Sequence, residues 1–236
     1  MALYSERVAL VTGSSRGVGR LIAEHFLKQG ASVIGVSRGG SDLAHEAYRH
    51  CQADVSDATA VQALFAGLRA QGISVDIVVN NAAVLTSQYA MILPASAAQA
   101  MVNINLMGPF LVSREAAKMM RKGKWGRIIN IGSMAASLEP EGDSMYAACK
   151  AAVATLANVM AREFAPMNVT CNTLGITAME TDMLRQLPRE KVDAVIARLP
   201  MPRYAVDDDV LNVIDFFASE RSGYITAQTV FLGGVN

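Results

Sequence analysis

The sequence predicts an α/β fold, a doubly wound parallel sheet with helices on both faces. Short apolar segments that read as strands alternate along the chain with longer segments whose apolar residues recur at helical spacing. This alternation is typical of a parallel sheet covered by helices on its two sides. The first apolar segment also runs directly into a glycine-rich turn and then a helix-like run, which is how such folds commonly begin.

Each element is predicted from its own residues. Short apolar runs are read as strands, and the segment 58–71 is read as a helix because Val61, Phe65 and Leu68 share one helical face. We expect strands at 7–12, 31–36, a short segment closing at 54–55, 75–79, 127–131, 168–174 and 229–232, and helices at 20–29, 58–71, 96–122, 144–164 and 207–218. Pro109 is expected to bend the long helix, because proline removes a backbone donor from a helix interior.

The chain is predicted to form a single domain over residues 1–236. It shows no internal repeat, low-complexity segment or linker, and its 236 residues are enough for one large domain with a substantial core. Residues 176–202 are punctuated by Met and Pro, and we expect them to form a partly mobile cover over the substrate.

The glycine-rich turn carries Gly13, Gly17 and Gly19 in the spacing G-x-x-x-G-x-G. Glycines let the backbone turn tightly and approach a pyrophosphate, which is favoured at the positive N-terminus of the following helix. The turn therefore indicates a Rossmann-type dinucleotide site. Ordinary turn chemistry without a ligand remains the alternative for this motif taken alone.

The end of the second strand predicts the choice of dinucleotide. An acidic residue there would favour NAD, whereas a nearby arginine accommodates the 2′-phosphate of NADP. This chain has Ser37 and Arg38 at that point, with no carboxylate, and Arg16 in the glycine-rich turn adds a second cation. We therefore predict NADP(H), with two solvated surface arginines as the alternative interpretation.

Tyr146 and Lys150 are the candidate reactive pair. They are four residues apart in an Ala-rich helical segment, so their side chains lie on one face, one turn apart. A phenol has a pKa of roughly 10, and a neighbouring ammonium group lowers it, which would prepare Tyr146 to exchange a proton. Ser133 ends an apolar strand and offers a hydroxyl to the same reacting oxygen. A lone Tyr-x-x-x-Lys is common by chance, so this motif indicates catalysis only in combination with the other motifs of the chain.

Taken together, these motifs resemble the short-chain dehydrogenase/reductase family over essentially the whole chain. The resemblance is strongest to the branch that contains 3-oxoacyl-carrier-protein reductases. The matching motifs are Thr12-Gly13-Ser-Ser-Arg-Gly17-Val-Gly19, Asp54-Val55, Asn80-Asn81-Ala82-Ala83, Asn105 in Asn-Ile-Asn-Leu-Met-Gly, Ser133, and Tyr146-x-x-x-Lys150. Each motif is modest alone, but their order and spacing together make a chance match very improbable.

The resemblance implies a role for each matching residue. Tyr146 would be the general acid in carbonyl reduction and the base in alcohol oxidation, and Ser133 would position the substrate oxygen. Lys150 would bind the nicotinamide ribose and depress the pKa of Tyr146, and Asn105 would hold a water that links Lys150 to solvent. The residues expected to contact the cofactor are Gly13, Ser15, Arg16, Gly17, Val18, Gly19, Ser37, Arg38, Asp54, Val55, Asn81, Ala82, Ala83, Tyr146, Lys150, Gly175, Ile176, Thr177 and Thr181.

Some positions depart from the family pattern. Ala83 replaces a usual glycine, and Leu174-Gly175 replaces the usual Pro-Gly. The segment after Gly175 is two residues longer than the pattern, so either Thr177 or Thr181 is the nicotinamide-side threonine. The C-terminal motifs also differ, and in the family these ends usually serve the subunit interface.

Composition excludes several classes of partner. Lys plus Arg equals Asp plus Glu at 21 each, which gives no electrostatic case for nucleic acid or an anionic membrane. Hydrophobic residues make up 52% of the chain, yet no apolar stretch is long enough to span a bilayer. Cys51, Cys149 and Cys171 have no metal-ligand spacing, so no metal site is expected. With three thiols and no signal segment at residues 1–7, we expect a cytoplasmic protein.

The motifs are compatible with three functions. The leading hypothesis is an NADP(H)-dependent oxidoreductase that interconverts a ketone and a secondary alcohol. A catabolic or biosynthetic alcohol dehydrogenase acting on a small free substrate would use the same residues. A non-catalytic dinucleotide sensor is disfavoured, because it would not need Ser133, Tyr146, Lys150 and Asn105 together.

The substrate and the assembly are predicted from surface features. Basic residues Arg121, Lys122, Lys124 and Arg127 could form one side of a rim for an acidic carrier, but 165–168 lacks the family's second docking cation. Glu139, Glu141 and Asp143 would repel such a carrier, so a free ketone or short thioester is expected to serve as well as a carrier-bound one. Small residues along 144–164 predict a homodimer or homotetramer. Met134, Met145, Met179 and Met183 either line the pocket or fill the core.

Overall fold

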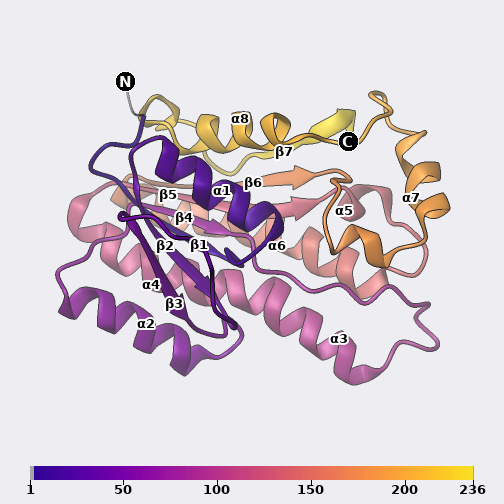
Figure 1. The fold of residues 1–236 in the computed structure, drawn as a ribbon, viewed down its shortest axis with the longest axis horizontal. Coiled ribbons are helices and arrows are strands. Elements are labelled where there is room, and N and C mark those ends of the chain that lie inside the picture. The colour runs from indigo at the N-terminus through magenta and orange to yellow at the C-terminus, as the bar shows by residue number, and fades with distance from the viewer. Residues whose placement is uncertain (1–2, 236) are drawn as a thin grey trace.

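The computed structural model describes residues 3–235, whose strands form one parallel sheet (Figure 1). Within these residues the strand order is β3-β2-β1-β4-β5-β6-β7. The strands are β1 (Val8–Thr12), β2 (Ser32–Ser37), β3 (Tyr48–Gln52), β4 (Ile77–Asn80), β5 (Gly126–Ser133), β6 (Val169–Ile176) and β7 (Thr229–Phe231). The order reverses between β1 and β4, which is where doubly wound sheets bind ligands at the carboxyl ends of their strands. The predicted fold class is confirmed.

Helices cover both faces of the sheet (Figure 1). One face is covered by α1 (Gly17–Lys28) and α8 (Asp207–Ala218), and the other by α2 (Ala58–Ala70), α4 (Gly108–Gly123) and α6 (Ser144–Phe164). The shorter helices α3 (Ala95–Val102), α5 (Ala135–Leu138) and α7 (Arg189–Ile196) lie toward the carboxyl ends of β5 and β6.

The strands divide their side chains between two cores. In β1, Leu10 packs on the side of α2, α4 and α6, while Ala9 and Val11 pack on the side of α1 and α8. All three are fully buried. Because both faces of an inner strand such as β1 are apolar, that strand appears in the sequence as a continuous apolar run. Burying one such aliphatic side chain contributes about 1.5–3 kcal/mol.

The predicted helix 96–122 is two helices joined by a π-helical turn at Asn103–Met107. The N–H of Gly108 donates to the carbonyl of Asn103, five residues earlier, as in a π-helix. Pro109 sits in the first turn of α4, where a missing N–H is tolerated. The interruption is therefore a π-helical turn directly before Pro109. The bend expected at the proline itself stays a prediction.

Two other boundaries differ from the prediction. β3 ends at Gln52, so Asp54 and Val55 follow the strand instead of closing it. In residues 176–202, β6 runs to Ile176, and a 3-10 turn at Leu184–Gln186 and then α7 follow.

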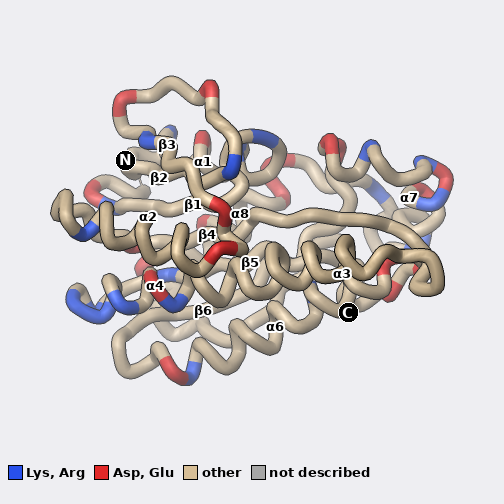
Figure 2. The backbone as a smooth tube through the Cα atoms, turned by 90° about the horizontal axis from the view of Figure 1, so that it is seen from below, with Lys and Arg blue, Asp and Glu red and all other residues tan. Residues whose placement is uncertain are grey.

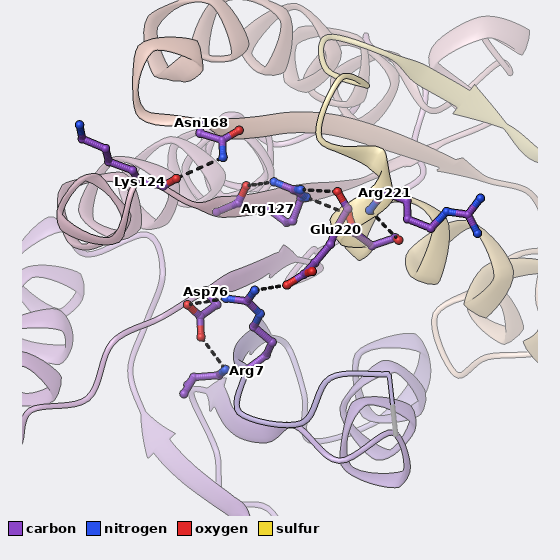
Figure 3. A network of polar contacts seen from close by, with 10 residues as sticks. Arg7, Asp76, Lys124, Arg127, Asn168, Glu220 and Arg221 are labelled. Carbon is purple, nitrogen blue, oxygen red and sulfur yellow. Dashed lines mark hydrogen bonds and ion pairs between the residues drawn. The ribbon is translucent and has the colours of Figure 1, made fainter. Parts of the chain in front are cut away.

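Arg127 was expected on an exposed rim, and the structure corrects this. It is only 1% exposed and lies at the start of β5. Its guanidinium donates to the carbonyls of Ser219 at 3.1 Å and Gly126 at 2.9 Å (Figure 3). It also lies over one face of the Trp125 ring, with 4.4 Å between the guanidinium carbon and the ring centroid. Arg127 therefore anchors the segment after α8 and is not available to an acidic carrier.

The other three cations of the expected rim lie near the amino end of β5, whereas the candidate reactive residues lie near its carboxyl end. Arg121, Lys122 and Lys124 are exposed where α4 ends, just before β5 begins (Figure 2). β5 has eight residues, so its two ends are roughly 23 Å apart. Ser133 is the last residue of β5, so these cations lie far from it within the same chain.

The described residues contain no helix with the length and apolar character needed to cross a bilayer.

Candidate active site

The candidate reactive residues meet where β5 ends and α6 begins. Ser133 is the last residue of β5, and Tyr146 and Lys150 are one turn apart on α6, as predicted. The Lys150 ammonium nitrogen is 5.7 Å from the centroid of the Tyr146 ring. All three side chains are buried, at 8%, 9% and 4% exposure respectively. Burial removes competing water and strengthens the electrostatic interactions among them.

Lys150 is held against the end of β5. Its Nζ donates a hydrogen bond of 2.7 Å to the carbonyl of Ile131. The Ser133 Oγ accepts a hydrogen bond of 3.1 Å from the N–H of Ala135 at the start of α5. Both groups are therefore fixed by β5 and the turn after it, so their positions relative to Tyr146 are set by the fold.

Asn105 is positioned by the π-helical turn. Its Oδ1 accepts from the N–H of Val84 at 2.8 Å, and its Nδ2 donates to the carbonyl of the same residue at 2.8 Å. The side chain is 1% exposed. These two bonds tie α3 and α4 to the loop after β4, and they use both ends of the amide.

The structure does not support a lowered pKa for Tyr146. Burial raises the pKa of Tyr146 to about 12, the Ser133 hydroxyl lowers it, and the charge of Asp143 raises it further. The phenol is therefore protonated at neutral pH, the form that can donate a proton. Burial also lowers the pKa of Lys150 to about 8, because a buried ammonium loses its hydration.

A cleft of about 540 Å³ opens beside these residues at the carboxyl ends of β1, β2 and β4. Tyr146 and Lys150 line one part of it. The predicted cofactor contacts that also line it are Gly13, Ser15, Arg16, Gly17, Val18, Ser37, Arg38, Asp54, Val55, Asn81, Ala82, Ala83, Ile176 and Thr181. The cleft thus brings the glycine-rich turn and the Tyr146 pair into one continuous space.

The turn after β1 needs glycine for two separate reasons. Gly13 and Gly17 have φ of +67° and +56°, a backbone conformation that strains other residues. Gly19 has no positive φ, but a Cβ placed there would lie 2.3 Å from the Gly13 carbonyl oxygen. The glycine-rich turn can therefore pack this closely against the first turn of α1 only if residue 19 is glycine.

Thr12 and Asn81 hold the two sides of this cleft together. The Thr12 Oγ1 accepts from the N–H groups of Asn81 and Ala82, both at 3.0 Å. The Asn81 Nδ2 donates to the Thr12 carbonyl at 3.0 Å and the Gly13 carbonyl at 3.3 Å. These bonds connect the ends of β1 and β4 at the point where the strand order reverses.

Two arginines line the cleft near the end of β2, and β2 itself does not end in a carboxylate. Arg16 and Arg38 are exposed and line the cleft, and no hydrogen bond or ion pair within residues 3–235 occupies either guanidinium. Ser37 Oγ donates to the Gly39 carbonyl at 2.9 Å and contacts His50 Nε2 at 2.8 Å. Although partial burial raises the pKa of Asp54, hydrogen bonds from Ser56 and the charge of Arg38 hold that pKa below its usual value.

Comparison with known proteins identifies the family. A model of the short chain dehydrogenase family matches residues 7–192. This chain is a member of the short-chain dehydrogenase family. It is therefore an oxidoreductase, and the family's cofactor is a nicotinamide dinucleotide.

Individual relatives match this short-chain dehydrogenase over nearly its whole length. The 3-oxoacyl-[acyl-carrier-protein] reductase FabG of Escherichia coli strain K12 is 32% identical over 237 residues, covering 98% of this chain and 97% of that protein. A gluconate 5-dehydrogenase from Burkholderia cenocepacia J2315, solved with NADP and tartrate, is 29% identical with a TM-score of 0.93 and covers 99% of this chain and 96% of that one. The ligand-free aldohexose dehydrogenase of Thermoplasma acidophilum is 27% identical with a TM-score of 0.90, covering 99% and 94%.

Three predicted contacts of this short-chain dehydrogenase lie outside the cleft. Gly19 is buried against the Gly13 carbonyl. Gly175 faces β7, since a Cβ there would lie 2.1 Å from the ring of Phe231. Thr177 is 6% exposed and faces the C-terminal turn, where its Cγ2 would contact a Cβ at Gly233. Of the two candidate threonines, only Thr181 lines the cleft among the described residues.

Other residues line the cleft without having been predicted. Val84 and Leu85 come from the loop after β4, and Asp182 and Gln186 come from the segment after β6. The remaining ones are Val36, Gly39, Ala53, Ile131 and Gly132. Met183, one of the four methionines expected near the pocket, also lines the cleft. Met179 is 7% exposed and belongs to the core beside α1 and α8.

Proposed function

We propose that this short-chain dehydrogenase is an NADP(H)-dependent ketoreductase. It would interconvert a ketone and a secondary alcohol, with Tyr146 as the general acid and base. The proposal depends above all on one observation, that buried Ser133, Tyr146 and Lys150 lie together beside a cleft that also contains the glycine-rich turn. A cleft of this kind would bring a dinucleotide to the carbon of one substrate carbonyl and a proton donor to its oxygen.

The residues of the chain suit these roles. The protonated phenol of Tyr146 would donate to the substrate oxygen during reduction, and the Ser133 hydroxyl would hold that oxygen in place. Lys150, fixed by the Ile131 carbonyl, would bind ribose hydroxyls with its remaining donors. Asn105 has both ends of its amide bonded to Val84, so we assign it to positioning the loop after β4 beside the cleft.

The glycine cradle supports a dinucleotide at this cleft. Gly13 and Gly17 expose backbone at the N-terminus of α1, where a pyrophosphate is favoured. Thr181 and Ile176 would border the nicotinamide side. When bound, the nicotinamide supplies the hydride, and the protein supplies position and the proton.

The choice of NADP over NAD is predicted to depend on Arg38. Arg38→Ala should raise the Kd for NADPH about tenfold or more, because a charge-assisted contact to the 2′-phosphate is lost. NADH affinity should change little, since NADH has no phosphate at that position. Titration calorimetry with both cofactors measures the effect.

Lys122→Ala is the matched control for this prediction. It removes one positive charge from the exposed C-terminal end of α4, at the opposite end of the strands from the cleft. The affinities for NADPH and NADH should both be unchanged. Equal affinity of the unmodified protein for NADPH and NADH would contradict the assignment of Arg38 and Arg16.

We propose that a free ketone or a short thioester serves as well as a carrier-bound substrate. Arg121, Lys122 and Lys124 lie at the edge opposite Ser133, while Glu139 and Glu141 are exposed beside the start of α6. The relatives named above include enzymes named for gluconate and aldohexose, besides a carrier-protein reductase. We propose that residues 176–202 cover this substrate.

The proposal is tested by screening ketones for NADPH consumption and alcohols for NADP⁺ reduction. One acyl group should then be compared on carrier protein and on a small thiol, at low and high salt. We expect similar kcat/KM values. A carrier preference of about a hundredfold that salt weakens would instead indicate an electrostatically guided carrier-protein reductase.

We further propose that the chain forms a homo-oligomer, a tetramer with twofold axes. Ala148 and Ala151 are exposed on α6 and Val159 is 49% exposed, which leaves a small-residue face that another helix can approach closely. Ala157 and Ala161, from the same predicted stripe, are buried in the core instead. Light scattering at micromolar concentration should give the mass of four chains, and the mass of one chain would contradict the proposal.

A further inference from the structure

The side chain at the end of β2 is held by a histidine of the edge strand β3. Ser37 Oγ donates to the Gly39 carbonyl at 2.9 Å and lies 2.8 Å from the Nε2 atom of His50. β2 and β3 are parallel, and His50 is paired with Gly35, two residues before Ser37. His50 and Ser37 are therefore diagonal neighbours on one face of the sheet.

The hydrogen atoms in these two contacts can be assigned from their chemistry. A serine hydroxyl has one hydrogen to donate, and the Gly39 carbonyl can only accept it. Ser37 Oγ must then accept in its other contact, so the hydrogen between the two side chains belongs to His50 Nε2. An Nε2–H is present both in one neutral tautomer and in the imidazolium, so this assignment holds in either charge state of the ring.

The hydroxyl held in this way lies beside the two cleft arginines. Ser37 lines the cleft together with Arg16 and Arg38. Among residues 3–235, His50 is not one of those that line the cleft, so it can act there only through Ser37. β3 also holds Arg38, because Gln52 Nε2 donates to the Arg38 carbonyl at 2.7 Å. A phosphate dianion offers only acceptors, so Ser37 can serve it only by donating its hydrogen.

We propose that His50 is a positioning residue for the choice of NADP(H) over NAD(H). By donating to Ser37 Oγ, it fixes the hydroxyl and leaves the serine hydrogen available on the cleft side. A histidine that accepted at Nε2 would take up that hydrogen instead. Ser37 then donates to the 2′-phosphate in place of the Gly39 carbonyl, and the bond accepted from His50 strengthens the one that Ser37 donates. This inference rests on the proposed NADP(H) dependence.

Titration calorimetry of His50→Leu with both cofactors tests the inference. We expect the Kd for NADPH to rise about fivefold, the usual scale for losing one hydrogen bond. The Kd for NADH should change by less than about twofold, because NADH lacks the phosphate that Ser37 serves.

His50→Gln is the variant that should rescue NADPH binding. The glutamine amide keeps an N–H donor and has no charge, so the Kd for NADPH should stay within about twofold of the unmodified protein. If this variant binds NADPH as weakly as His50→Leu, the ring acts through its charge or its shape. That result would overturn the donor role of His50.

A double-mutant cycle tests whether His50 acts through Ser37. Ser37→Ala alone should raise the Kd for NADPH about tenfold, because a hydrogen bond to a charged acceptor is lost. Adding His50→Leu to Ser37→Ala should raise the Kd no further, whereas two independent effects would multiply to about fiftyfold. The multiplied effect would overturn the inference.

His45→Leu is the matched control for the loss of an imidazole ring. His45 is exposed in the loop between β2 and β3, where its Nδ1 accepts from the Ala47 N–H at 3.1 Å. Its replacement should leave the Kd values for NADPH and NADH unchanged. An equal loss of affinity for both cofactors in His50→Leu would show that His50 only supports the fold near the cleft, and would overturn the inference.

The outcomes also separate this inference from the proposed function. If the unmodified protein prefers NADPH and His50→Leu binds it with unchanged affinity, only the role of His50 is overturned. Equal affinity of the unmodified protein for NADPH and NADH overturns both the role of His50 and the proposed cofactor choice.

Discussion

Tyr146→Phe should lower turnover by at least ~10²-fold, the usual scale for loss of a general acid. The substitution removes the phenol hydroxyl and keeps the ring, which packs with Met101, Ala135 and Cys149. The fold and the cleft should therefore persist, and NADPH affinity should change little. Steady-state kinetics on a verified ketone, together with calorimetry of NADPH binding, measure the two effects.

Tyr89→Phe is the matched control for this prediction. Tyr89 is 53% exposed, and its hydroxyl contacts only Glu141 at 3.3 Å among the described residues. Removing the same atom there should leave turnover unchanged. Near-normal turnover of the Tyr146 variant would show that another group donates the proton.

The direction of the reaction should show in its pH dependence. Burial raises the pKa of Tyr146 to about 12, so the phenol stays protonated across the neutral range. Reduction needs that protonated form, whereas oxidation needs the phenolate as a base. In the unliganded protein this favours the acid role, and replacing Asp143 by a neutral residue should lower the pKa of Tyr146, because a nearby negative charge opposes phenolate formation.

Local sequence patterns were sufficient for the parts of the site that lie within one element. Tyr146 and Lys150 share a helix face because four residues make about one turn. The turn at Gly13 and Gly17 was predictable because its positive φ values restrict the choice of residue. Ser133 was predictable because it ends an apolar strand.

Features that depend on contacts between distant segments were not predictable. The π-helical turn at Asn103–Met107 places Asn105 against Val84, a contact between a helical turn and a distant loop that sequence periodicity does not predict. Arg127 reads as a surface cation until Trp125 and the carbonyls after α8 enclose it. The choice between Thr177 and Thr181 likewise depends on how the segment after β6 folds back over the sheet.

Lys150→Met should abolish most activity and at the same time stabilise the fold. The substitution keeps an unbranched side chain but removes the charge and the donors that would bind the ribose. We expect kcat/KM to fall at least ~10²-fold, from loss of both cofactor binding and orientation. Unlike Tyr146→Phe, this variant should also bind NADPH more weakly.

The expected gain in stability follows from the buried charge. Burial lowers the pKa of Lys150 from 10.5 to about 8, and one unit corresponds to about 1.4 kcal/mol, so burying the ammonium costs on the order of 3 kcal/mol. The lost hydrogen bond to the Ile131 carbonyl offsets about 1 kcal/mol of this. The net gain of about 2 kcal/mol should raise the Tm by roughly 4–8 °C at neutral pH.

The pH dependence of this gain has a definite sign. Below pH 8 both the folded and unfolded chains hold the Lys150 proton, and the cost of burying the charge is present in full. Between about 8 and 10.5 the unfolded chain holds more protons than the folded one, so the stability of the unmodified protein rises with pH. The Tm difference between Lys150→Met and the unmodified protein should therefore shrink as the pH is raised from 7 to 10. Melting curves at fixed protein concentration test this, and a Tm that falls on substitution at pH 7 would mean that the hydrogen bond to Ile131 outweighs the buried charge.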